Sequence, residues 1–220
     1  MPEFILMLTR DDQTVPDARA LYDELADSGV THVGFKDVGL PADELAALVR
    51  DIRGNGHTVH LEVVAESREA TLTSARLAAS LEPDYLLGGS LIEPVQEVIA
   101  GSDIRFFPYV GRVVGHPCQL RGSVPEIVED VLRAEAAGVD GINLLAYRHS
   151  GEVPTLIKAV CEATELPVVC AGSVASEQQI HDLAGFGVWG FTIGAAVLDM
   201  RVVDAPSLRG QVDAVLRAAG

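Results

Sequence analysis

Residues 166–196 read LPVVCAGSVASEQQIHDLAGFGVWGFTIGAA, and the fold class follows from this stretch. The apolar run 167–171 has the length of a buried strand and ends in a Gly-Ser pair. The apolar run 188–193 ends in Gly-Ala-Ala, and residues 176–185 between the two runs have helical spacing. Short apolar strands that alternate with helices predict parallel βαβ units.

Small residues follow both of these strands, Gly172 and Ser173 after the first and Gly194 and Ala195 after the second. Backbone N–H groups can approach an anion closely at such places, and the start of a helix adds favourable partial charge. A Cβ atom in place of a glycine hydrogen would obstruct that approach. We therefore predict that these four residues bind a phosphate group.

The same alternation of strand and helix extends over the whole 220-residue chain. Strands are expected at Glu3–Thr9, Thr31–Lys36, His57–Ala65, Asp84–Leu87, Ile104–Tyr109, Asp140–Ala146, Pro167–Ala171 and Val188–Ile193. Eight such units in a chain of this length predict a (β/α)8 TIM barrel, in which residues 1–220 form a single domain. An open doubly wound sheet is the alternative, but no GxGxxG opens the first unit.

The composition limits the class of protein. A formal net charge of −16 argues against binding to nucleic acid and to anionic membrane surfaces. No apolar run approaches transmembrane length, and no signal-peptide pattern is present. The three cysteines, Cys118, Cys161 and Cys170, show no CxxC or Cys/His metal spacing. We expect reduced thiols in a cytoplasmic protein that holds neither a metal nor a cofactor.

In a TIM barrel the active site lies at the carboxyl ends of the strands. Side chains alternate along a strand, so Lys36 and Glu62 are expected to point into the barrel from adjacent strands. A lysine and a glutamate close together in a dry pocket can work as an acid/base pair. A structural ion pair that fills a barrel layer is the alternative. His60 shares the face of Glu62 and is expected to be a core histidine rather than a metal ligand.

Four further polar residues are candidates for the site. His116 lies in the longest loop and can act in acid/base work as part of a lid, or simply form a turn. Asn143 is expected to face inward and to bind substrate or neighbouring backbone. Arg148 can meet a carboxylate or a phosphate, or remain solvated. Asp11, beside Asp12, can contact substrate hydroxyl groups or cap the first helix.

With Gly172–Ser173 and Gly194–Ala195 at the ends of its last two strands, the sequence resembles the ribulose-phosphate-binding barrel superfamily. The resemblance implies a TIM barrel whose seventh and eighth strands hold the phosphate of a small-molecule substrate. The third strand has no DxKxxD pattern, and the first and fifth strands lack the paired aspartates of the histidine-pathway isomerases. The resemblance therefore implies phosphate binding but no particular reaction.

Four functional hypotheses follow. The first is an isomerase or epimerase of a phosphorylated sugar or ketose, in which Lys36 and Glu62 move a proton next to a carbonyl group. The second is an aldolase-type lyase in which Lys36 forms a Schiff base. The third is a prenyl-type transferase, and the fourth is a barrel that binds a phosphorylated metabolite without catalysis. Barrels of this kind often pair, so a homodimer is a further option.

Overall fold

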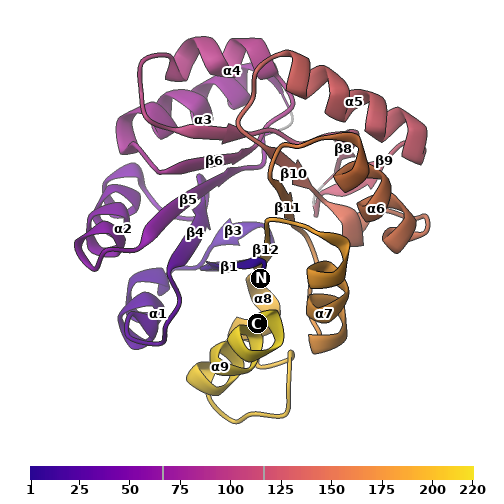
Figure 1. Ribbon diagram of the computed structural model, residues 1–220. Helices are drawn as coiled ribbons and strands as arrows, with labels where there is room; N and C mark the ends of the chain where they lie inside the picture. Colours follow the sequence, from indigo (N-terminus) through magenta and orange to yellow (C-terminus); the bar gives the residue numbers. More distant parts are fainter. Residues whose placement is uncertain (66, 116) are drawn as a thin grey trace.

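The structure, a computed structural model, describes residues 1–65, 67–115 and 117–220. Eight parallel strands surround a central axis, and the helices that connect them form an outer ring (Figure 1). Neighbouring strands follow the order β10 (Ile142–Leu144), β11 (Val168–Cys170), β12 (Gly190–Ile193), β1 (Glu3–Met7), β4 (His32–Lys36), β5 (Thr58–Val63), β6 (Tyr85–Gly88) and β7 (Arg105–Phe107). The predicted (β/α)8 barrel is confirmed.

The barrel is completed where β7 meets β10. The Asn143 N–H donates to the Pro108 carbonyl at 2.9 Å, and the Asp140 N–H donates to the Phe106 carbonyl at 3.0 Å. The Asp140 carboxylate accepts the Phe106 N–H at 2.8 Å, and Tyr109 and Asn143 form an isolated parallel bridge. These two strands therefore meet through separate hydrogen bonds instead of a continuous ladder, and the barrel is nearly closed.

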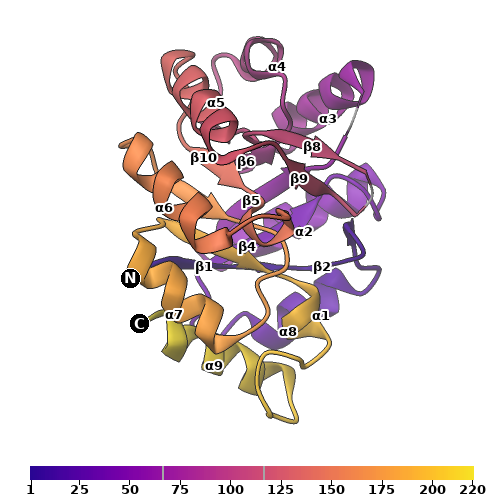
Figure 2. The same cartoon turned by 90° about the vertical axis from the view of Figure 1, so that its right-hand side faces the viewer.

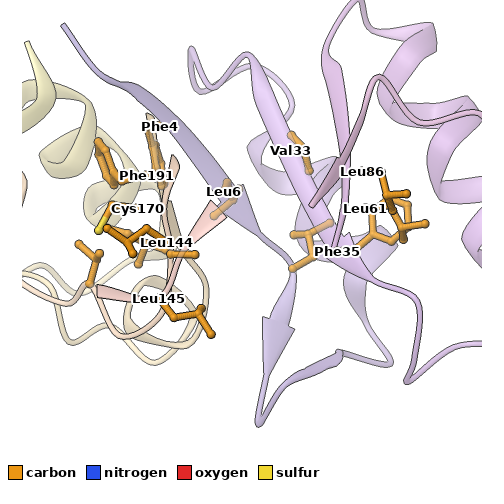
Figure 3. Packing of buried hydrophobic residues seen from close by; sticks show 14 of the residues in the cluster. Phe4, Leu6, Val33, Phe35, Leu61, Leu86, Leu144, Leu145, Cys170 and Phe191 are labelled. Atoms are coloured by element: carbon orange, nitrogen blue, oxygen red, sulfur yellow. The ribbon is translucent and has the colours of Figure 1, made fainter. Parts of the chain in front are cut away.

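Each strand buries both of its faces, which explains why the strands read as apolar runs. Side chains on the outward face pack between the strands and the helices, among them Leu6 of β1, Phe35 of β4 and Leu61 of β5 (Figure 3). Inward-facing apolar side chains such as Ile5 and Phe107 fill the barrel itself. Because parallel strands share one direction, their carboxyl ends all reach the same end of the barrel.

The outer ring contains the helices that the spacing predicts. They are α1 (Ala18–Leu25), α2 (Ala42–Gly54), α3 (Arg68–Leu81), α4 (Ile92–Ile99), α5 (Val124–Ala136), α6 (Val153–Ala163), α7 (Glu177–Phe186) and α9 (Leu208–Ala219). Serine side chains accept a backbone N–H at the starts of three of them, at Ser67, Ser176 and Ser207. Ser123 and Glu126 form a reciprocal capping box at the start of α5.

Two short hairpins occupy segments that the sequence leaves as loops. β2 (Thr9–Arg10) pairs with β3 (Gln13–Thr14), and β8 (Arg112–Val114) pairs with β9 (Gln119–Arg121), both antiparallel. The chain also contains a 3-10 turn, η1 (Ala146–Arg148), and a one-turn helix, α8 (Ala195–Leu198). Figure 2 shows that β2 lies at the opposite end of the barrel from the two chain termini. These short elements surround the carboxyl ends of the strands.

Aromatic and histidine side chains fill the other end of the barrel interior. His60 is fully buried, stacks on Tyr85 with ring centroids 4.5 Å apart, and shares a 2.9 Å hydrogen bond with His32. Trp189 and Phe107 pack against the same Tyr85 ring. His60 is thus a core residue, as expected. It fills the barrel interior one layer closer to the amino ends of the strands than Lys36 and Glu62.

Candidate functional site

A pocket of about 200 Å³ opens at the carboxyl ends of the strands. Its walls come from the ends of β1, β4, β5, β11 and β12, from the β2–β3 hairpin and from α8. Seven residues of the predicted site border it: Asp11, Lys36, Glu62, Gly172, Ser173, Gly194 and Ala195. The structure therefore brings the expected acid/base pair into the same pocket as the four residues that are expected to bind phosphate. We call these four residues, Gly172, Ser173, Gly194 and Ala195, the phosphate cradle.

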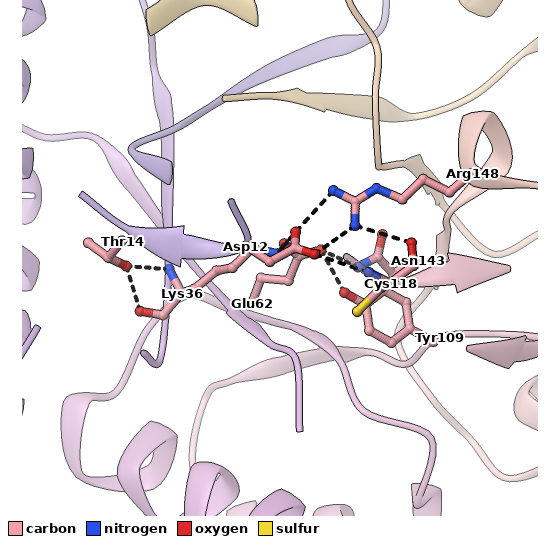
Figure 4. A network of polar contacts seen from close by, with 8 residues as sticks. All are labelled: Asp12, Thr14, Lys36, Glu62, Tyr109, Cys118, Asn143 and Arg148. Carbon is pink, nitrogen blue, oxygen red and sulfur yellow. Dashed lines mark hydrogen bonds and ion pairs between the residues drawn. The ribbon is translucent and has the colours of Figure 1, made fainter. Parts of the chain in front are cut away.

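Lys36, which borders this pocket, lies between two carboxylates (Figure 4). Its Nζ donates to Asp12 Oδ1 at 2.8 Å and approaches Glu62 Oε2 at 3.0 Å. All three residues are at most 5% exposed. Lys36 and Glu62 are register partners on β4 and β5, so strand pairing fixes their proximity. The hydroxyl group of Thr14 binds both the N–H and the carbonyl of Lys36, which fixes the backbone at that point.

The other oxygen of Glu62 has partners from across the barrel. Tyr109 donates its hydroxyl group to Glu62 Oε1 at 2.9 Å, and Asn143 Nδ2 donates to the same oxygen at 3.4 Å. Asn143 is fully buried, and its Oδ1 has no hydrogen-bond partner among the described residues. An unpaired buried acceptor is unfavourable by about 1–3 kcal/mol, so this oxygen is suited to a hydroxyl group of a ligand or to a water molecule.

Arg148 binds the second carboxylate of the network. Its two terminal nitrogens donate to the two oxygens of Asp12 at 2.9 and 3.0 Å, a bidentate pair. The Cys118 N–H donates to Asp12 Oδ2 at 3.1 Å, and the Cys118 carbonyl accepts from Arg148 at 3.3 Å. The loop between β8 and β9 is thereby attached to the site. Arg148 therefore contacts a carboxylate, that of Asp12, and its side chain lies beside the pocket instead of lining it.

These contacts set the protonation of the buried groups. Burial alone would raise the pKa of Asp12, but the Arg148 hydrogen bonds and the Lys36 charge outweigh it and hold that pKa well below its usual range. Burial alone would lower the pKa of Lys36, but Glu62 and Asp12 raise it above the ordinary value. Burial, together with the Glu62 charge, raises the pKa of Tyr109. Lys36 is therefore an ammonium ion and Tyr109 a neutral phenol at neutral pH.

Asp12, which the sequence indicates together with Asp11 as a substrate contact or a helix cap, is the central residue of the buried network. The two residues form the turn of the β2–β3 hairpin, with φ of +48° at Asp11 and +57° at Asp12. Positive φ at both central positions matches a type I′ turn, which keeps the hairpin tight. Asp12 then points into the barrel, whereas Asp11 lies exposed at the pocket mouth. A two-residue polar turn after a buried strand is the signal that could have identified this arrangement.

The predicted phosphate cradle has free backbone donors. Gly172 and Ser173 have successive positive φ angles of +79° and +66°, a conformation that turns consecutive N–H groups toward one side. The N–H groups of Ser173, Val174, Ala195 and Ala196 donate to no acceptor among the described residues. All four residues border the pocket. The arrangement is suited to binding an anion.

The two glycines of the cradle also lie against neighbouring protein atoms. A Cβ atom at Gly172 would lie 3.0 Å from the Arg148 side chain, and one at Gly194 would lie 2.7 Å from Thr9 Oγ1. The missing side chains therefore make room for Arg148 and for the end of β1, and the expected phosphate contact at these glycines stays a prediction. His116 lies outside the described residues, so its predicted role stays a prediction.

No protein-family model and no curated protein matches the chain. Solved structures are similar over nearly the whole length. Orotidine 5′-phosphate decarboxylase from Pyrococcus horikoshii OT3 has a TM-score of 0.71 and 14% identity, with 98% of each chain covered. The native KDPGal structure has a TM-score of 0.69 and 14% identity, covering 99% of this chain and 94% of the other.

The tryptophan synthase alpha chain from Legionella pneumophila subsp. pneumophila has a TM-score of 0.68 and 14% identity, covering 99% of this chain and 91% of the other. These likenesses confirm the (β/α)8 barrel fold that the resemblance implied. At this level of identity the likeness is evidence of the fold alone. In the described ranges, no helix has both the length and the apolar character needed to cross a membrane.

Proposed function

We propose that the protein is an enzyme that acts on a small phosphorylated sugar or ketose and moves a proton at a carbon next to the carbonyl group. The observation that carries this proposal is the shared pocket. The Lys36–Glu62 pair borders one part of it, and the free N–H groups beside Gly172 and Gly194 border another. A volume of about 200 Å³ favours a substrate of a few carbon atoms.

In this proposal Glu62 is the base. Its Oε1 is occupied by Tyr109 and Asn143, which leaves Oε2, the atom next to Lys36, to take the proton from carbon. The electron pair of the broken C–H bond moves onto the carbonyl oxygen and gives an enolate. The Lys36 ammonium group stabilises that oxygen. For an isomerisation, the hydroxyl group on the carbon that lost its proton passes its own proton to the enolate oxygen, and Glu62 delivers its proton to the former carbonyl carbon. The carbonyl group thereby moves to the neighbouring carbon.

The phosphate serves as an anchor. Its oxygens would accept from the N–H groups of Ser173, Val174, Ala195 and Ala196, and the unpaired Oδ1 of Asn143 would accept from a substrate hydroxyl group. Binding energy from these non-reacting groups then holds the reacting carbon beside Glu62. Asp11 at the pocket mouth is a further candidate for a hydroxyl contact.

A Schiff-base lyase is the second candidate, because Lys36 is a buried primary amine that borders the pocket. The nucleophile in such a reaction is the neutral amine. The charges of Glu62 and Asp12 raise the pKa of Lys36 and so oppose that role, although burial acts in the opposite direction. Proton transfer therefore ranks first. Borohydride reduction in the presence of substrate would leave an adduct on Lys36 only if the lyase is correct.

The test begins with a thermal-shift screen of phosphorylated sugars. Hits are then incubated in D2O, and loss of the proton next to the carbonyl is followed by NMR. We expect exchange with the wild type and with the surface variant Glu97→Gln, and none with Glu62→Gln. Stabilisation that persists in Lys36→Ala and Glu62→Ala, without exchange in the wild type, would instead indicate a non-catalytic binding protein.

The homodimer also stays a prediction, which sedimentation analysis tests.

A further inference from the structure

Two arginines at the pocket mouth share a single carboxylate. Arg10 Nε donates to Asp199 Oδ1 at 2.7 Å, and Arg201 donates to Asp199 Oδ2 at 3.0 Å. Arg10 also donates to the carbonyl of Leu198, the last residue of α8, at 2.8 Å. Both arginines border the pocket, and neither is part of the buried Asp12–Lys36 network.

Their position relates them to the cradle. The Arg201 N–H donates to the carbonyl of Ala196 at 2.8 Å, and Arg10 reaches the other end of the same short helix. The first residues of that helix, Ala195 and Ala196, carry two of the free N–H groups of the cradle. Both arginines and the two residues that carry these backbone donors thus border the same pocket.

The contacts of the two arginines to Asp199 are weak enough for another anion to replace the Asp199 carboxylate. The side chains of Arg10 and Asp199 are 37% and 36% exposed, and that of Arg201 is 60% exposed. Exposed ion pairs are weak, in contrast to the buried pair of Asp12 and Lys36. The hydrogen bond from Arg10 lowers the pKa of Asp199, so the carboxylate is ionised and available as a competitor at neutral pH.

The charges of this group favour one class of anion. Arg10, Arg201 and Asp199 together carry a formal charge of +1, and Asp199 already supplies one negative charge to both guanidinium groups. A monoanion offers these arginines little that Asp199 does not already offer. A phosphomonoester dianion brings a second charge and three acceptor oxygens.

We propose that Asp199 competes with the substrate's phosphate for Arg10 and Arg201, and that a phosphomonoester dianion, which carries two charges against the single charge of Asp199, displaces this carboxylate when it binds in the cradle. The inference rests on the proposed function, since it assigns a ligand to the same cradle. On binding, both guanidinium groups turn from the Asp199 carboxylate to phosphoryl oxygens. Asp199 then remains solvated at the pocket mouth, where its exposure keeps the loss of its partners small in free energy.

The test measures the affinity for inorganic phosphate by calorimetry at pH 8 and low salt. We expect Asp199→Asn to bind phosphate about two- to fivefold more tightly than the wild type, because the competitor is removed. Arg10→Gln and Arg201→Gln should bind it more weakly by a similar factor. Dimethyl phosphate, a monoanion, should gain less from Asp199→Asn than phosphate does, because the removed charge repels one ligand charge instead of two.

Two control variants show whether the change in affinity is specific to the pocket mouth. Asp27→Asn removes a surface carboxylate that pairs with Arg209 instead, and Arg53→Gln removes a surface arginine outside the pocket. Both should leave the affinity unchanged. If Arg10→Gln does not fold, Arg10→Lys keeps the charge but loses the planar guanidinium fork and should also bind more weakly.

The outcomes separate the inference from the proposed function. The variant Ser173→Asp places a carboxylate in the cradle and should abolish binding. If Ser173→Asp abolishes binding while Asp199→Asn and both arginine variants match the wild type, the competition is refuted and the cradle stands. Weaker binding by Asp199→Asn refutes the competition as well. A wild-type protein that binds no phosphate refutes both.

Discussion

The variant Lys36→Met removes the cation from between Asp12 and Glu62 without a large change in side-chain volume. The ammonium group lies 2.8 Å from one carboxylate and 3.0 Å from the other. With an effective dielectric constant of about 20, each contact supplies about 6 kcal/mol of Coulomb attraction. The variant no longer has to bury an ammonium group, which offsets several kcal/mol of this sum.

The net loss depends on what the carboxylates retain. Breaking a buried pair by removing one partner destabilises a protein by about 3–5 kcal/mol. Asp12 keeps its bidentate bond to Arg148, and Glu62 keeps its hydrogen bonds to Tyr109 and Asn143. We therefore expect a loss near the lower end, about 3 kcal/mol.

Urea unfolding followed by circular dichroism provides the assay. The surface variant Lys158→Met should change the free energy of unfolding by less than about 0.5 kcal/mol. In the double variant Lys36→Met/Glu62→Gln, no unpaired charge remains on β5, so we expect it to recover at least half of the loss. A loss below about 1 kcal/mol for Lys36→Met, or a double variant less stable than the single one, would contradict this account of the network.

The pH dependence has a definite sign. The pKa of Lys36 is raised above 10.5, so its stabilisation is present below that value and is lost as pH rises through the folded-state pKa. The pKa of Asp12 is lowered below 3.8, so its stabilisation is present above that value and is lost as pH falls. The difference in the free energy of unfolding between the wild type and Lys36→Met should therefore be constant between about pH 5 and 9.

Three other perturbations test separate features. Gly172→Ala should destabilise more than Gly138→Ala in urea unfolding, because both have positive φ but only the first would place a Cβ 3.0 Å from the Arg148 side chain. Asp12→Asn should lower the free energy of unfolding by about 3 kcal/mol, whereas Asp11→Asn at the neighbouring exposed position should change it by less than about 0.5 kcal/mol. Burial holds the pKa of His60 well below 6.5, so the stability of the wild type should fall as pH decreases below that value, and His60→Met should flatten the slope measured from pH 7 to 5.

The strands were predictable from the sequence because parallel strands are buried on both faces. The apolar run 3–9 contains β1, and the run 188–193 contains β12. Alternation within a strand also predicted that Lys36, Glu62 and Asn143 face the barrel interior, and the structure confirms that all three do. These signals are local, since each depends only on the spacing of apolar residues.

The contacts that complete the site could not be read in the same way. Asp12 and Cys118 are 106 residues apart, and the bond between them uses a backbone N–H that carries no sequence signal. Arg148 reaches Asp12 from η1, a three-residue turn too short to show periodicity. The inward direction of Tyr109 follows from alternation, since Phe107 two residues earlier faces the interior. Its hydrogen bond to Glu62 on β5 depends on the closure of the barrel, which the sequence does not show.

The seam between β7 and β10 joins the integrity of the barrel to that of the site. Tyr109 comes from one side of this seam and Asn143 from the other, and both donate to the same oxygen of Glu62. A local motion that parts the two strands would separate Asn143 from the side of the seam that carries Tyr109, and would therefore disturb the contact that the two donors share at Glu62. Glu62 therefore accepts hydrogen bonds from both sides of the seam. The backbone N–H of Asn143 donates across the same seam, so its rate of exchange with solvent deuterium reports how often the seam opens and these contacts to Glu62 are disturbed.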